Sequence, residues 1–151
     1  MSVRNRTSTT PAHKKAEQFN VDKDMWTSIQ EYPYANEYII YAPIVNHRGA
    51  FYVFGGFSGV REQTIGRLDP SSGTWSRVGQ LVTGRAGHNV IFDGVDFIVV
   101  GGYWPPRLQS VNTEVCSIND EQAVSCISQK PEWTGYAYYP EFLLVSDSFC
   151  Q

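Results

Sequence analysis

The sequence predicts an all-β fold built from repeated four-stranded antiparallel units, and two features of its 151 residues support this. First, aromatic residues make up 14% of the chain beside 13 Gly and 8 Pro, which is typical of many short strands joined by turns. Second, an apolar strand ending in two glycines occurs twice, as FYVFGGF from residue 51 and FIVVGGY from residue 97. The glycine pairs are 46 residues apart, and a unit recurring at such a period indicates a repeat architecture.

Residues 1–16 are predicted to be a disordered basic tail, because they contain four basic residues, no acidic residue and many Ser and Thr. The net charge of −3 therefore divides into +4 for this tail and −7 for residues 17–151. An acidic folded part argues against a nucleic-acid surface. The tail lacks the apolar region of a secretory signal peptide, and no segment approaches the roughly 18 uncharged apolar residues of a membrane span.

Residues 17–26 and 66–75 share one pattern, and each predicts a β-hairpin. The segments end in Trp26 and Trp75, and seven residues before each tryptophan stands an apolar residue followed by Asn or Asp. An Asx residue followed by polar turn residues is typical of the connection between two antiparallel strands.

The stretch after the second hairpin completes the repeat. GRAGH (84–88) precedes a predicted strand at 89–92, a turn at Asp93-Gly94 and a second strand at 95–100. Each repeat then contains about four short strands, which is the composition of a propeller blade. Two further segments, 17–31 and 134–145, each predict half a blade.

These features resemble the kelch-repeat family of β-propellers, and the resemblance covers about residues 17–128. It implies an all-β, partial kelch-like propeller over residues 17–151, with about three four-stranded antiparallel blades and incomplete terminal blades. The glycine pairs are expected to turn the chain sharply and to let large side chains pack on bare backbone. The residues that carry the resemblance, all expected to be structural, are Trp26, Gly55, Gly56, Trp75, Arg85, His88, Gly101 and Gly102.

Cys116 and Cys126 stand at mirror positions about a predicted hairpin tip at 120–122. Opposed residues in an antiparallel pair are close enough for a disulfide, which we expect here in place of the missing tryptophan; two unpaired buried thiols are the alternative. A disulfide favours an extracellular location, whereas the start of the chain carries no signal peptide. The C-terminal segment from Pro131 further resembles the ends of secreted invertebrate kelch proteins, and the pairing of Cys150 stays open.

About three blades are fewer than the four that a closed propeller requires. Three arrangements stay open: an open fragment, which we favour; a longer natural chain; and a homodimer in which two chains share half blades to complete a six-bladed ring.

No enzymatic function, cofactor or metal site is predicted. The three histidines, His13, His47 and His88, lie too far apart in sequence for a metal-binding motif. The Asp box of sialidase propellers, S-x-D-x-G-x-T-W, agrees with this chain only at Thr74 and Trp75.

The sequence instead favours a non-catalytic scaffold that binds an unidentified protein partner through loops on one propeller face. The loops after the glycine pairs, 57–64 and 103–110, leave the strands for the surface, where binding residues concentrate. They contribute the candidates Arg61, Trp104 and Arg107, because Trp and Arg are enriched at binding hot spots. The alternative is a carbohydrate-binding or vestigial galactose-oxidase-like or sialidase-like propeller.

Overall fold

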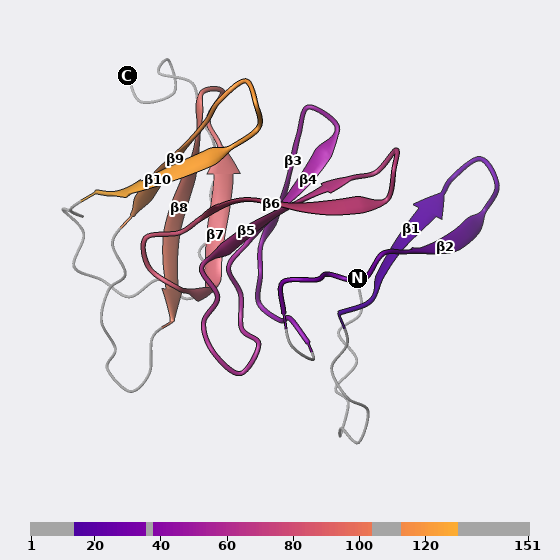
Figure 1. Ribbon diagram of the computed structural model, residues 1–151, viewed down its shortest axis with the longest axis horizontal. Coiled ribbons are helices and arrows are strands. Elements are labelled where there is room, and N and C mark those ends of the chain that lie inside the picture. Colours follow the sequence, from indigo (N-terminus) through magenta and orange to yellow (C-terminus); the bar gives the residue numbers. More distant parts are fainter. Residues whose placement is uncertain (1–13, 36–37, 104–112, 130–151) are drawn as a thin grey trace, which may run out of the picture.

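The computed structural model describes residues 14–35, 38–103 and 113–129, and all regular secondary structure in these ranges is β-strand (Figure 1). The strands are β1 (Ala16–Asn20), β2 (Met25–Ile29), β3 (Ile44–His47), β4 (Ala50–Phe54), β5 (Thr64–Asp69), β6 (Thr74–Gln80), β7 (Ala86–Phe92), β8 (Asp96–Tyr103), β9 (Glu114–Ile118) and β10 (Val124–Ser128). The all-β fold predicted from the sequence is thereby confirmed.

The strands form an N-terminal hairpin, β1–β2, and one eight-stranded sheet in the order β3-β4-β5-β6-β10-β9-β8-β7. Within the sheet, β3–β6 and β7–β10 are each a run of sequential antiparallel strands, which we call the first blade and the second blade. Figure 1 shows the hairpin, the first blade and the second blade following one another across the molecule. The predicted four-stranded repeat units are therefore present.

The two blades are joined at their outer strands, which the sequence does not predict. Strands β6 and β10 pair in parallel through Val124 opposite Gly79 and Ser125 opposite Gln80. A Cβ atom at Gly79 would lie 2.2 Å from the Val124 carbonyl oxygen, so only glycine permits this approach.

The main core lies between the facing surfaces of the two blades. Tyr52 and Phe54 of β4 alternate toward the second blade, and their ring centroids lie 5.3 and 5.1 Å from that of Phe97 on β8. All three side chains are fully buried. His47 ends β3, and its ring centroid lies 4.2 Å from that of Phe92 in the same cluster.

The first glycine pair allows the close approach that the sequence predicts, whereas the second pair, Gly101-Gly102, lies within β8. A Cβ at Gly55 would lie 2.8 Å from the Arg85 carbonyl oxygen, and a Cβ at Gly56 would lie 2.7 Å from Ile39 Cδ1. Both glycines have positive φ, at 54° and 105°. The chain turns at this pair while neighbouring backbone and side chains pack directly against it.

Four predicted boundaries differ from the structure. Strand β7 begins at Ala86 rather than Asn89, and β8 continues through Gly101-Gly102 to Tyr103, because the β7–β8 ladder pairs Ala86 with Tyr103 and His88 with Gly101. Trp26 and Trp75 are the second residues of β2 and β6 rather than strand ends.

Residues 1–13 of the predicted tail and the predicted half blade at 134–145 lie outside the described residues. Within the described part of the chain, the structure has no helix long and apolar enough to span a membrane.

Candidate functional site

The loops that follow the strands at the glycine-pair end of the blades form one surface. The β4–β5 loop (55–63) and the β6–β7 loop (81–85) both lie there, since β4 and β6 run toward this end and β5 and β7 leave it. We call these two loops together the loop face. The loop after β8, which contains the predicted residues Trp104 and Arg107, lies outside the described residues.

Backbone hydrogen bonds tie the two loops of the loop face together. The Gly56 amide donates to the Arg85 carbonyl at 2.9 Å, the Arg85 amide to the Glu62 carbonyl at 3.3 Å and the Leu81 amide to the Gln63 carbonyl at 2.7 Å. The Gln63 side-chain amide adds a bond to the Val82 carbonyl at 2.9 Å. The loops thus act as one connected unit.

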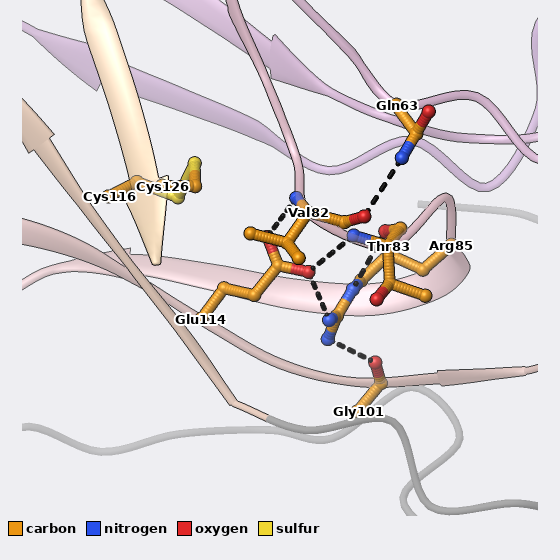
Figure 2. A network of polar contacts seen from close by, with 8 residues as sticks. All are labelled: Gln63, Val82, Thr83, Arg85, Gly101, Glu114, Cys116 and Cys126. Carbon is orange, nitrogen blue, oxygen red and sulfur yellow. Dashed lines mark hydrogen bonds and ion pairs between the residues drawn. A yellow bond between two sulfur atoms is a disulfide. The ribbon is translucent and has the colours of Figure 1, made fainter. Parts of the chain in front are cut away.

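A buried ion pair anchors this unit to the second blade (Figure 2). Arg85 Nη2 lies 2.5 Å from Glu114 Oε1, and both side chains are fully buried. The Glu114 carboxylate also accepts hydrogen bonds from the Val82 and Thr83 amides at 2.8 and 2.9 Å. Arg85 Nη1 donates to the Gly101 carbonyl at 3.1 Å. Burial lowers the pKa of Arg85, whereas the charge of Glu114 and its hydrogen bond raise it.

This network holds the Arg85 side chain away from solvent, and it identifies Glu114, which sequence reasoning missed. A single Glu in a predicted strand gives no signal of burial, because charged residues are mostly exposed. Glu114 could have been sought only through Arg85, because a buried Arg requires an acidic partner.

His88 lies beneath the loop face and is 4% exposed. Burial, together with the nearby positive charge of Arg85, lowers its pKa to about 3. The ring is therefore neutral at physiological pH. A structural role for His88 stays a prediction.

The exposed side chains of the loop face are apolar in part. Val60 and Val82 are exposed. Arg61, in the β4–β5 loop, is half-buried, and a Cβ on Gly84 of the β6–β7 loop would lie 2.5 Å from its carbonyl oxygen. The Ser58 hydroxyl donates to the Glu62 carboxylate and closes the turn that presents Val60. Sequence reasoning singled out Arg61 in this loop but missed Val60 and Val82, because one valine in a polar loop carries no pattern.

Cys116 and Cys126 face each other on β9 and β10 and form a disulfide with an S–S distance of 2.08 Å. The ladder registers show which residues they replace. In the first blade Phe51 pairs with Leu68, which pairs with Trp75; in the second blade Phe97 pairs with Cys116, which pairs with Cys126. The disulfide therefore stands where the first blade has its Leu–Trp pair, as the sequence predicts.

Among residues 14–35, 38–103 and 113–129, the one group with three potential metal ligands in reach of each other is Glu114, Cys116 and Cys126. Its two sulfur atoms are bonded to each other, and its carboxylate is engaged by Arg85 and two amides. Within the described ranges, this group therefore offers no free thiolate to a metal ion.

Comparison with known families identifies the repeat. The family model for the kelch motif matches residues 41–81, which span the whole first blade from β3 to β6. The chain contains a kelch repeat.

A solved kelch propeller, described as the structure of YjhT, is similar to this chain with a TM-score of 0.52 and 16% sequence identity. The match covers 84% of this chain but only 54% of that one, so the chain spans about half the length of the kelch propeller it resembles. At this identity the likeness shows the fold alone. No curated protein matches the chain, and the comparisons lend no support to the resemblance with secreted invertebrate kelch proteins.

Proposed function

We propose that this chain is a non-catalytic kelch-type scaffold that binds another protein through the loop face. The observation that carries the proposal is the anchoring of two surface loops to a fully buried ion pair. Loops held in one conformation lose little entropy on binding, and this favours recognition by shape.

The chemistry of the exposed side chains supports a protein partner. Val60 and Val82 present apolar surface next to Arg61, and such a mixture is typical of protein interfaces. Trp104 and Arg107, which follow β8 in the sequence, add the residue types that dominate binding hot spots.

The buried ionisable groups support a non-catalytic role. Arg85 and Glu114 neutralise each other away from solvent, and His88 is neutral with a pKa of about 3. A general base must exchange protons near the working pH, which a histidine with this pKa does not do.

The proposal is tested by capturing a partner from an extract with the full chain and then measuring Kd for the purified partner. Val60→Asp and Val82→Asp together, and Trp104→Ala with Arg107→Ala, are each expected to weaken binding at least about tenfold, or about 1.4 kcal/mol. The matched control is Val95→Asp, because Val95 is 74% exposed in the β7–β8 turn at the opposite end of the blades. A partner whose Kd changes in none of the loop variants would refute the proposal. Glycan binding that survives all of them would favour the carbohydrate-binding alternative.

A further inference from the structure

A groove of about 660 Å³ lies between the N-terminal hairpin and the outward face of the first blade. One side is β1, with Lys14 and Lys15 before it. The other side is largely apolar and comes from the first blade and the segment that leads into it, with Ile44, Phe51, Val53, Leu68 and Trp75 among its lining residues. The groove is a separate feature from the exposed valines of the loop face.

The ladder registers identify the hairpin as half a blade. Phe19 pairs with Trp26 in β1–β2 as Leu68 pairs with Trp75 in β5–β6. The hairpin is therefore equivalent to the outer two strands of the first blade, in agreement with the sequence pattern. In the first blade the inner edge of this pair is taken by β4, and in the second blade by β8.

The corresponding place beside β1 has no strand among the described residues, where β1 pairs with β2 alone. The groove lies there. Its position is thus that of a missing inner strand pair, equivalent to β3 and β4.

A comparison of the two blades indicates that such a strand pair would cover Phe51. Phe97 and Phe51 are equivalent by register, yet Phe97 is 0% exposed and Phe51 is 37% exposed. Phe97 is covered by the alternating aromatic residues Tyr52 and Phe54 of the preceding inner strand. The same arrangement around Phe51 requires an inner strand rich in aromatic or aliphatic side chains.

One segment of this chain has that composition and length. Residues 134–145 read TGYAYYPEFLLV, about as long as the 11 residues from Ile44 to Phe54 that form β3, its turn and β4. Pro140 lies near its middle, where a turn between two strands would come. The segment follows β10, which is the place in the repeat order where inner strands come next. Glu141 has the opposite charge to the groove lysines.

We propose that the groove binds residues 134–145 of a second copy of this chain as the two inner strands of a shared blade. In one copy, the segment comes after the second blade in the sequence, and the first blade stands between the second blade and the hairpin that borders the groove (Figure 1). Two copies joined head to tail satisfy both grooves. Each shared blade adds to the two blades of each copy, and the pair forms a six-bladed ring.

The test is the solution mass of the full chain by light scattering after size exclusion. The expected mass is that of two chains of 17.0 kDa. Ile44→Glu places a charge in the groove at a residue that is 63% exposed and is expected to give a single-chain mass. Val95→Glu, the same kind of change at an exposed valine that does not line the groove, is expected to retain the two-chain mass.

A mixing experiment separates a lost junction from a misfolded variant. Leu144→Glu is expected to be a single chain as well, since it damages the segment rather than the groove. Ile44→Glu still has an intact segment and Leu144→Glu an intact groove, so an equimolar mixture should recover the two-chain mass through one intact junction.

Three results would overturn the proposal. They are a single-chain mass for the unaltered protein at the highest soluble concentration, a two-chain mass that neither variant changes, and single-chain variants that do not associate when mixed. None of these results bears on partner binding by the loop face, whose test uses other residues.

Discussion

Removing the charge of Glu114 should destabilise the fold far more than removing any exposed carboxylate. In Glu114→Gln, the Arg85 guanidinium stays fully buried but loses the counter-charge that lies 2.5 Å away. Breaking a buried pair by removing one partner costs about 3–5 kcal/mol. That is a large share of the 5–15 kcal/mol that stabilises an ordinary domain.

The assay is urea unfolding followed by the fluorescence of the four tryptophans. With a slope of about 2 kcal/mol per molar urea, the midpoint of Glu114→Gln should fall by about 2 M. Glu121→Gln is the matched control, because Glu121 is exposed at the tip of the same β9–β10 hairpin; it should change stability by less than about 0.5 kcal/mol.

A double variant tests the cause. Arg85→Met combined with Glu114→Leu removes both charges together, so it should cost clearly less than the sum of the two single changes. The amides of Val82 and Thr83, which donate to Glu114, should also exchange hydrogen faster in Glu114→Gln. A loss below about 1 kcal/mol for Glu114→Gln, or additive costs in the double variant, would refute the reasoning.

Three further predictions follow from the disulfide, from His88 and from Gly55. Reduction of the Cys116–Cys126 bond, which joins residues 10 apart, should lower the free energy of unfolding by about 3 kcal/mol, and a chain with both cysteines changed to alanine should not respond to reductant. With a folded pKa of about 3, His88 takes up a proton only in the unfolded state between about pH 6.5 and 3, so the unfolding free energy should fall by about 2 kcal/mol from pH 7.5 to pH 5. His88→Gln should remove that part of the slope in urea titrations at the two pH values, and an unchanged slope would contradict the assignment. Gly55→Ala should cost about 2 kcal/mol more than Gly59→Ala in the same assay, because both positions have positive φ but only the first brings a Cβ within 2.9 Å of two carbonyl oxygens. Equal costs would show that close approach at Gly55 is unimportant.

The hairpins and the cysteine pairing could be predicted from the sequence, because residues close together in the chain determine them. The hairpins follow from an Asx residue at the start of each turn: the Asn20 side chain accepts from the Lys23 amide, and the Asp69 side chain accepts from the Ser71 amide. The cysteine pairing was predictable because an antiparallel register is symmetrical about its tip.

The contacts between distant segments could not be predicted in the same way. The Arg85–Glu114 pair joins residues 29 apart, and no periodicity marks either of them as buried. The parallel pairing of β6 with β10 depends on how the two blades twist against each other, and at Gly79 the only local sign was the absence of a side chain. For the loop face, the β4–β5 loop was predictable from the first glycine pair, whereas the β6–β7 loop and the exposed valines were not.

The exposed fraction of one equivalent side chain in the hairpin and in each blade shows how burial increases along the chain. The inner member of the cross-strand pair is Phe19 in the hairpin, Leu68 in the first blade and Cys116 in the second, and these side chains are 39%, 7% and 0% exposed. The first blade covers the second, and Tyr32, which follows the hairpin in sequence, partly covers the first. The hairpin has no comparable cover among the described residues.

This order has an energetic consequence. A two-stranded hairpin is marginally stable alone, and the aromatic contact of Phe19 with Trp26 at 5.0 Å leaves both side chains exposed. The second blade, by contrast, has a fully buried pair position and a disulfide across it. The hairpin is therefore the part of the described chain that gains most from a neighbouring strand pair. The groove stands beside this least covered unit, and filling it would stabilise the repeat where its own packing is weakest.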